Sequence, residues 1–255
     1  MRPSDIYIQR VLEYVEKKRG EGKPIKEIVA PTQVEQLTEG LPIKVGPRSS
    51  TGIILEEDTF LELGNPNTAS CAFVLFTDEI SFISDGRITL IGPDIQEAAE
   101  KKLPFAQVIT VASAHDYSDK NYTLVERTQY VSDQIEGYMI RAVPQRMWSR
   151  ISTETFQKGF SFEVLGRALQ SIYRTKLPFV DAIEVLFVVS NREDVEELYG
   201  MASEARKITR RIKEIKKKEY TPDDVCQECD FEKVCDEIKK LLEMRGISNS
   251  DVCVR

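Results

Sequence analysis

Three runs of apolar residues constrain the fold of this chain more than any other feature. They are CAFVLF (residues 71–76), FAQVITVA (105–112) and AIEVLFVV (182–189). Short runs without regular polar alternation are typical of strands that are buried on both faces. The chain is therefore expected to form a sheet that is covered by helices on both sides.

A fourth strand, RITLI (87–91), leads through Gly-Pro-Asp into a helix expected over residues 95–102. Asp94 at its N-cap and Glu97 three residues later match a capping box. The order strand, helix, strand favours parallel pairing. We therefore predict an α/β fold with a mixed, largely parallel sheet flanked by helices, an N-terminal helical arm and a C-terminal cysteine-bearing helical tail.

The remaining elements follow from apolar spacing and from proline and glycine positions. A short strand is expected at 60–63, and further helices over residues 4–18, 126–143, 153–158, 162–173 and 192–218. The end of the last helix, ARKITRRIKEIKKK, is basic on most faces, which we interpret as a solvated surface. The predicted segments are a helix with a connecting arm (1–52), an α/β domain (53–220) and the tail (221–255).

The tail contains the main candidate metal ligands, because three of the five cysteines lie within ten residues. Cys226 and Cys229 have the spacing that lets two thiolates reach one metal, Cys235 follows closely, and Cys253 is a candidate fourth ligand. Thiolates without histidine suit an iron-sulfur cluster, with zinc as the alternative. A second interpretation is that these are reduced structural cysteines.

The remaining cysteine and the single histidine are weaker candidates for a functional site. Cys71 lies in an apolar run and is expected to be a small core residue. His115, the single histidine, reads as a polar loop residue in ASAHDYSD, so a histidine-rich zinc enzyme is disfavoured. The sequence has no GxGxxG or P-loop motif for a nucleotide.

Charge and hydropathy narrow the class of partner and the compartment. The formal net charge of −7 argues against general nucleic-acid binding. The sequence has neither an apolar run of the roughly 18 residues that a membrane helix needs nor a signal-peptide core at its N-terminus. Clustered cysteines suit a reducing compartment. We therefore expect a cytoplasmic protein that does not bind membranes.

Several motifs occur in an order that resembles one known family. ELGNPNTASCAFVLF (62–76) precedes DGRITLIGPDI (85–95), and IEGYMIRAVPQRMWSRISTETFQKGFSFEVLGRAL (135–169) precedes LPFVDAIEVLFVVSNREDVEEL (177–198). Together they resemble the middle domain of the β subunit of the carbon monoxide dehydrogenase/acetyl-CoA synthase complex. That nickel-iron-sulfur protein joins a methyl group, carbon monoxide and coenzyme A.

The resemblance implies that the cysteine stretch corresponds to the start of the family's active-site cluster, the A-cluster. In the family, four cysteines hold an iron-sulfur cubane of the A-cluster, and a distant Cys-Gly-Cys holds the outer nickel. Cys226, Cys229 and Cys235 resemble the first three cubane ligands, with Cys229 as the bridge, and Cys253 would be the fourth. The Cys229–Cys235 spacing is shorter than the family's, there is no Cys-x-Cys, and the chain ends at Arg255. We therefore expect no complete catalytic centre here, and whether the chain is an enzyme stays open.

The resemblance also implies a coenzyme A site. The family's middle domain binds coenzyme A near a tryptophan surrounded by arginines, which corresponds here to Trp148 with Arg141, Arg146 and Arg150. Arginines present forked donors to phosphates, and an indole face can stack on adenine. The alternative is a buried core tryptophan with exposed arginines around it.

Three functions follow from these expectations. The first is a stand-alone homologue of the middle domain that binds coenzyme A or an acyl-CoA and acts with partner subunits in anaerobic one-carbon and acetyl-CoA metabolism. The second is a non-catalytic accessory or assembly protein that holds an iron-sulfur cluster or zinc in its tail. The third is an A-cluster fragment completed by another chain. A homo-oligomer is left open.

Overall fold

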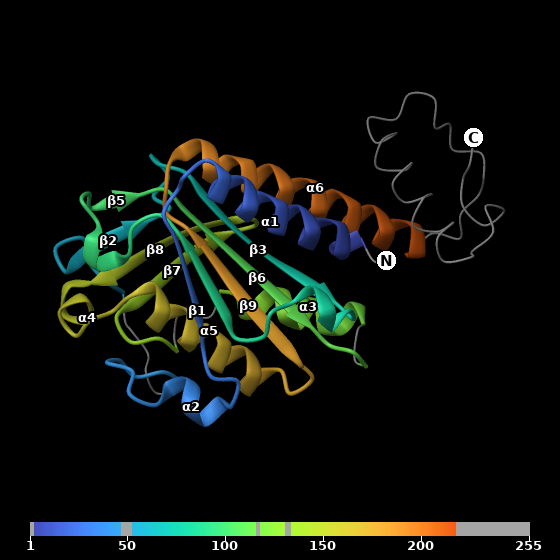
Figure 1. Cartoon of the computed structure of the whole chain (residues 1–255), viewed down its shortest axis with the longest axis horizontal. Coiled ribbons are helices and arrows are strands. Elements are labelled where there is room, and N and C mark those ends of the chain that lie inside the picture. Colours follow the sequence, from blue (N-terminus) through green and yellow to red (C-terminus); the bar gives the residue numbers. More distant parts are fainter. Residues whose placement is uncertain (1–2, 47–52, 116–117, 131–133, 218–255) are drawn as a thin grey trace.

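Two mixed sheets and their helices make up the described part of the protein (Figure 1). The computed structural model describes residues 3–46, 53–115, 118–130 and 134–217. The α/β class and the N-terminal helix are confirmed. The predicted tail, with Cys226, Cys229, Cys235 and Cys253, lies outside the described residues.

The larger sheet holds five strands in the order β1 (Ile25–Val29), β4 (Arg87–Ile91), β9 (Ala182–Val188), β6 (Phe105–Ala112) and β3 (Ser70–Thr77). β4 pairs with β9, and β3 with β6, in parallel, whereas β1 is antiparallel to β4 and β6 to β9. The four predicted strands of this sheet are confirmed.

The prediction of a largely parallel sheet is wrong. Two of the four pairings in the larger sheet are antiparallel, and so are two of the three in the smaller one. The physical reason is that a strand buried on both faces is apolar whichever way it runs, so its composition does not encode its direction.

The smaller sheet has the order β5 (Lys102–Leu103), β2 (Thr59–Leu63), β8 (Arg146–Ser152) and β7 (Tyr138–Val143). β7 and β8 form an antiparallel hairpin, β2 is antiparallel to β8, and β2 runs parallel to β5. Of the helix expected over residues 126–143, only residues 126–128 are helical in the described part of the chain, and residues 138–143 form β7.

Two local features explain these departures from the predicted helices. α3 (Asp119–Thr128) ends before residue 143 because Tyr138 onward pairs with β8, and cross-strand pairing outweighs local helix propensity. The helix expected at 95–102 is one 3₁₀ turn, η2 (Ile95–Glu97), because the chain turns directly into β5. The predicted capping box of Asp94 with Glu97 is confirmed.

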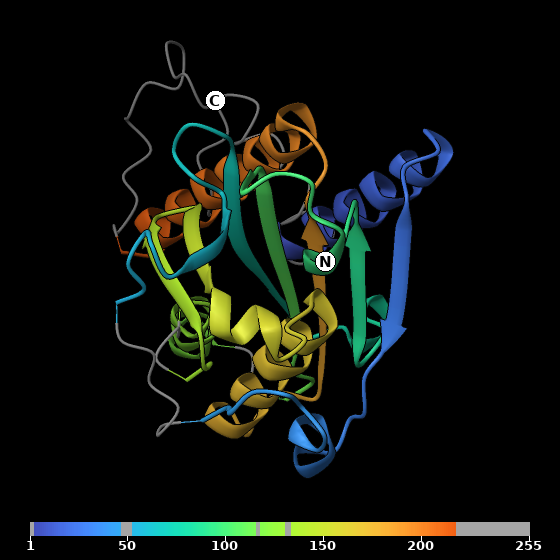
Figure 2. The same cartoon turned by 90° about the vertical axis from the view of Figure 1, so that its left-hand side faces the viewer.

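One face of the larger sheet is covered by α1 (Pro3–Gly20) and α6 (Arg192–Lys217), which lie side by side (Figures 1 and 2). The fully buried Cys71 faces this layer, so its prediction as a core residue is confirmed. Alternate residues of β3, β6 and β9 pack there against the helices, among them Phe73, Leu75, Val108 and Leu186. The helices contribute Tyr7 and Val11 from α1, and Leu198 and Met201 from α6.

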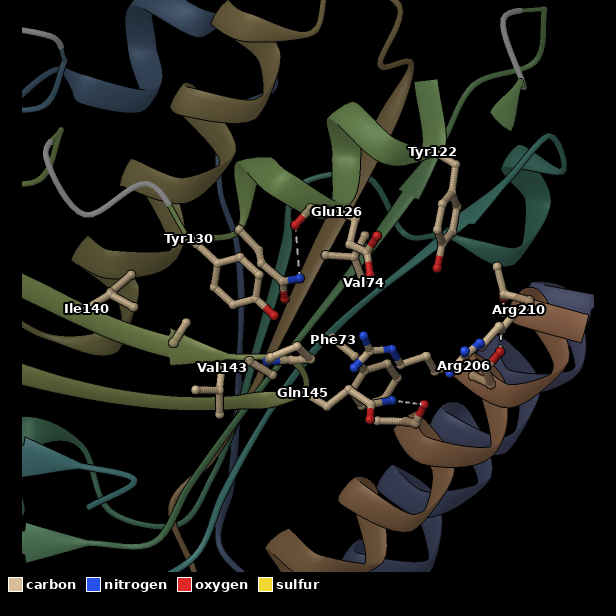
Figure 3. Close-up of a pocket in the computed structure, with 17 residues that line it drawn as sticks. Phe73, Val74, Tyr122, Glu126, Tyr130, Ile140, Val143, Gln145, Arg206 and Arg210 are labelled. Atoms are coloured by element: carbon tan, nitrogen blue, oxygen red, sulfur yellow. Dashed lines mark hydrogen bonds between the residues drawn. The ribbon is translucent and has the colours of Figure 1, made fainter. Parts of the chain in front are cut away.

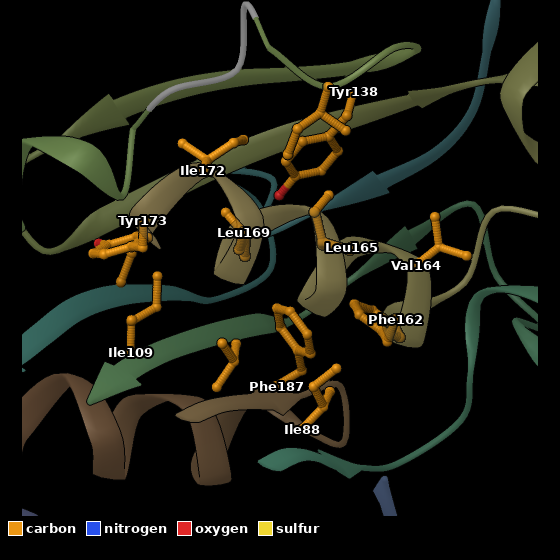
Figure 4. Close-up of a cluster of buried hydrophobic side chains, with 14 of the residues drawn as sticks. Ile88, Ile109, Tyr138, Phe162, Val164, Leu165, Leu169, Ile172, Tyr173 and Phe187 are labelled. Carbon is orange, nitrogen blue, oxygen red and sulfur yellow. The ribbon is translucent and has the colours of Figure 1, made fainter. Parts of the chain in front are cut away.

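The opposite face packs on α5 (Phe162–Lys176) and the smaller sheet, with α2 (Val34–Thr38) lying outside α5 (Figures 1 and 4). Phe162 and Phe187 have ring centroids 5.0 Å apart at the centre of this core. The predicted helix at 153–158 is confirmed as α4 (Thr153–Gln157), capped by the Ser152 hydroxyl. The ion pair between Arg146 on β8 and Glu196 on α6 places the outer face of the β7–β8 hairpin beside the start of α6.

Two further observations concern the ends of the predicted domain. β1 belongs to the predicted arm of residues 1–52 and pairs with β4. The boundaries predicted at residues 52 and 220 stay a prediction. No helix among the described residues combines the length and the apolar character needed to cross a membrane.

Candidate functional site

The β7–β8 hairpin presents Trp148 and its neighbouring arginines on one face. Burial alternates along β8: Met147, Ser149 and Ile151 are buried, and the residues between them are not. Arg146, Trp148 and Arg150 therefore share the outer face. On β7, Arg141 is the register partner of Trp148.

Two guanidinium groups lie close to the Trp148 ring. The Arg150 guanidinium carbon is 4.7 Å from the indole centroid, and that of Arg141 is 5.4 Å away. Both distances suit cation–π attraction. The indole Nε1 is buried and finds no hydrogen-bond acceptor within the described part of the chain. The ring is half-buried, so Trp148 belongs to a surface site rather than to the centre of the core.

A cavity of about 500 Å³ opens beside this ring. A volume of this order is typical of small-molecule sites. Its walls come from the loop between β2 and β3, the end of β7, the start of β8 and the first turns of α6. The lining residues are Gly64, Asn65, Pro66, Thr68, Ala69, Ser70, Arg141, Ala142, Val143, Arg146, Met147, Trp148, Arg192 and Glu196.

Arg146 lines the cavity, but its charge is already compensated. Its two terminal nitrogens donate to the Glu196 carboxylate at 2.9 and 3.2 Å, and one of them also donates to the Ser70 carbonyl at 3.1 Å. Its guanidinium stacks 3.7 Å from the Tyr199 ring centroid. Hydrogen bonding to Glu196 raises the pKa of Arg146. Arg146 thus ties β8 to α6.

Arg150 is also committed to a structural role. Its Nε donates to Glu62 at 2.9 Å, and its Nη1 donates to the Ile54 carbonyl at 2.9 Å. Glu62 is buried, and it also accepts a hydrogen bond from Asn65. Arg150 supports the loop that forms one wall of the cavity, and it supports one face of Trp148, without lining the cavity itself.

Two arginines at the cavity remain exposed to solvent. Arg141 lies over Trp148, and among the described residues no ion pair or hydrogen bond engages its guanidinium. Arg192 donates to the Asn67 carbonyl at 2.8 Å and keeps further donors available. Both can receive an anion that enters beside the indole.

Part of this arrangement corresponds to the residues predicted from the sequence. Trp148, Arg141 and Arg146 line one cavity, and Arg150 lies beside it, but their role as ligand-binding residues stays a prediction. Arg192 and the loop of residues 64–70 were not anticipated. The available signal was that Arg192 follows a buried strand and opens a helix, a position that often faces a ligand in α/β proteins.

The described part of the structure does not test the predicted metal site of the tail cysteines. Within the described ranges, no group of three or more histidine, cysteine, aspartate or glutamate side chains is arranged to hold a metal ion. The four tail cysteines lie beyond those ranges, so their role stays a prediction. His115 is an exposed loop residue, as expected.

Comparison with known families gives one match, over residues 41–195, to a family described as "CO dehydrogenase/acetyl-CoA synthase complex beta subunit". This segment contains Trp148 and most of the cavity wall. It includes both hairpin strands and the loop before β3.

Curated relatives agree with that match. The acetyl-CoA decarbonylase/synthase complex subunit beta 1 of Methanosarcina thermophila is 27% identical over 164 residues, covering 64% of this chain and 34% of the relative. The subunit beta of Methanothermobacter thermautotrophicus is 28% identical over 167 residues (65% and 35%), and that of Methanopyrus kandleri is 29% identical over 192 residues (74% and 41%). The chain thus spans about a third of the length of the first two relatives.

Proposed function

This chain belongs to the CO dehydrogenase/acetyl-CoA synthase complex beta subunit family, and on that basis we propose that it binds coenzyme A or an acyl-CoA in the cavity beside Trp148. It would act with partner subunits, since relatives are named as subunits of the acetyl-CoA decarbonylase/synthase complex. The match covers about a third of those relatives, so the proposal concerns binding and not the whole subunit's reaction.

The observation that carries the proposal is the cluster of Arg141, Trp148 and Arg150 at the edge of a cavity with a second exposed arginine, Arg192. Coenzyme A combines an adenine ring with a 3′-phosphate and a diphosphate. A planar indole suits the adenine, and the forked donors of arginine suit the phosphates. The cavity supplies both kinds of group within one wall.

The supporting residues fix the geometry of that wall. Arg146, held by Glu196 and Ser70, keeps β8 against the first turns of α6, and Arg150, held by Glu62, keeps the loop in place. These ion pairs leave Arg141 and Arg192 to meet the ligand's charge. We therefore assign contact roles to Trp148, Arg141 and Arg192, and positioning roles to Arg146 and Arg150.

Fluorescence of Trp148 gives a direct test, because it is the only tryptophan in the chain. Titration with coenzyme A is expected to quench its emission saturably, and dephospho-coenzyme A, which lacks the 3′-phosphate, is expected to bind more weakly. Pantetheine, without nucleotide, should leave the signal unchanged. The absence of a saturable response at millimolar coenzyme A would refute the proposal.

Variants separate a phosphate contact from a general charge effect. Arg141→Gln or Arg192→Gln is expected to weaken coenzyme A binding about tenfold, the effect of losing one charge-assisted hydrogen bond. The matched control is Arg127→Gln, because Arg127 is exposed on α3 and lies outside this cavity. Equal weakening in all three variants would indicate screening of net charge and not a site.

The cysteine spacing favours a second function that the same protein could combine with the first. Cys226, Cys229, Cys235 and Cys253 would hold an iron-sulfur cluster or zinc, as in an accessory or assembly protein. Anaerobic purification followed by iron, acid-labile sulfide and zinc analysis tests this. Cys226→Ser is expected to lower the metal content, and an unchanged content would exclude a tail site.

A further inference from the structure

A second cavity, of about 630 Å³, lies on the other side of the β7–β8 turn (Figure 3). It meets the first cavity at Ala142 and Val143, which line both. Its walls are the edge strand β3, helix α3, the hairpin and α6. The lining residues are Ala72, Phe73, Val74, Tyr122, Glu126, Gln129, Tyr130, Ile140, Ala142, Val143, Pro144, Gln145, Ala202, Ala205, Arg206, Thr209 and Arg210.

The hairpin turn forms a fixed wall of this cavity. Gln145 has φ 64°, the left-handed region, and no other non-glycine residue among those described has a positive φ. Its carbonyl accepts the Ala72 N–H at 3.1 Å, and its side-chain amide donates to the Ala202 carbonyl. One strained residue thus joins the turn to both β3 and α6. Such a conformation persists where the surrounding contacts hold it, often beside a binding site.

β3 offers backbone groups to the cavity. It is the last strand of its sheet, and Ala72 directs its N–H away from β6, toward Gln145. Backbone groups two residues apart on a strand point the same way, so the N–H and C=O of Val74 also face the cavity. The turn already occupies the Ala72 N–H, so Val74 is the residue of β3 that offers its backbone groups to the cavity.

Arginine and tyrosine side chains form the polar side of the cavity. Figure 3 shows Arg206 and Arg210 reaching from α6 toward the side where Tyr122 and Tyr130 lie. Burial raises the pKa of Tyr130 to about 12, and Glu126 raises it too, so the phenol stays protonated and can donate a hydrogen bond at neutral pH. Glu126 is the acidic side chain in the lining, and two arginines face it.

The remaining lining is apolar. Val74 and Ile140 form part of it, and Val143, a residue that is 64% exposed, lies at the rim shared with the first cavity. Together with Val74 and Ile140, Val143 gives the cavity an apolar wall on which the body of a ligand can lie.

We propose that this second cavity binds a small organic anion, a carboxylate or phosphate monoester that carries an aromatic or aliphatic body. Its anionic group lies between the Arg206 guanidinium and the Tyr130 hydroxyl, and its body lies on Val74, Ile140 and Val143. This site is separate from the coenzyme A site and does not depend on it.

An aromatic anion whose fluorescence rises in apolar surroundings can test the proposal. The probe is 1-anilinonaphthalene-8-sulfonate, whose sulfonate stands in for the carboxylate or phosphate. We expect saturable binding to one site that weakens about tenfold in Arg206→Gln, as for the loss of one charge-assisted hydrogen bond. Lys207→Gln is the matched control, since Lys207 is the exposed neighbour that does not line the cavity.

Competition identifies the chemistry of the ligand. Phenyl phosphate or benzoate is expected to displace the probe, and the stronger of the two identifies the preferred head group. Benzyl alcohol, which has no charge, should displace it poorly. Binding that survives Arg206→Gln, or displacement by benzyl alcohol as effective as by the anions, would overturn the proposal.

Arg141→Gln keeps this test independent of the coenzyme A proposal. Arg141 lines the first cavity and not the second. We therefore expect this variant to bind the probe as the unmodified protein does. Loss of probe binding in Arg141→Gln together with retention in Arg206→Gln would place the probe in the first cavity and refute a second site.

Discussion

Replacing Lys18 by Met is expected to destabilise the protein strongly, because Lys18 is the buried link between its first and last described helices. Its ammonium group lies 2.6 Å from Asp194 and 3.2 Å from each of Glu21 and Glu197. Lys18 and Asp194 are each 4% exposed. Methionine keeps an unbranched side chain of nearly the same length but lacks the charged ammonium group and its donors, so it leaves the Asp194 carboxylate buried without that partner.

The magnitude follows from what remains around Asp194. Breaking a buried ion pair by removing one partner typically costs about 3–5 kcal/mol. Lys23, 3.0 Å from Asp194, and the Ser190 hydroxyl still contact the carboxylate, so we expect about 3 kcal/mol. Urea unfolding followed by far-ultraviolet circular dichroism measures the loss.

The matched control is Lys17→Met on the same helix. Lys17 pairs with Glu197 at 2.8 Å, but its side chain is 53% exposed. Exposed pairs contribute about 0–1 kcal/mol. If the two variants lose the same stability, burial is not what gives the Lys18 pair its strength, and the reasoning is refuted.

The pH dependence gives the same prediction a second readout. Burial by itself disfavours the Asp194 carboxylate, but hydrogen bonds from Lys18, Ser190 and Lys23 outweigh it and hold the pKa of Asp194 below its ordinary value. A lowered folded-state pKa means a contribution that is complete above the unfolded pKa, about 4, and is lost as the pH falls through the folded value. Lys18→Met should therefore flatten the acid limb of the stability profile, and an unchanged slope would contradict this.

Two further predictions concern the core and the loop before η2. Phe187 on β9 packs against α5 at the centre of the core, so Phe187→Ala is expected to lower the free energy of unfolding in urea by about 3–5 kcal/mol. The control Leu124→Ala removes an exposed side chain on α3 and should cost far less. Similar losses in the two variants would show that Phe187 is not central to the core. Asp94→Ala removes the acceptor for the Ile95 and Phe162 amides and should lower the free energy of unfolding by about 1–2 kcal/mol. Asp94→Asn keeps an acceptor oxygen at this position and should retain most of that stability. Equal losses in the two variants would argue against the capping role.

The sequence predicted the elements of the core better than their connections. The runs at 71–76, 105–112 and 182–189 are strands because both of their faces are covered, and that requirement is visible in composition alone. Strand direction and order depend on how connections cross the sheet, which composition does not record. The segment 138–143 was expected to be helical because its partner strand lies beyond a turn that local patterns did not reveal.

The candidate site could be predicted only where it is local. Arg146, Trp148 and Arg150 alternate along one strand, so their shared face follows from strand geometry once β8 is known. Arg192 and Arg206 join cavities through the packing of α6 on the sheet, a long-range contact. The basic end of that helix was interpreted as solvated surface, yet Arg206 and Arg210 line the second cavity.

The pairing of α1 with α6 has a consequence for the protein's synthesis. Helix α1 buries Tyr7, Ile8 and Val11 against strands and a helix that are synthesised after it. Its apolar face therefore has its full set of native partners only after α6 has been synthesised. Because domains with such distant contacts fold slowly and expose apolar surface meanwhile, we expect chaperones to protect the apolar face of α1 during synthesis.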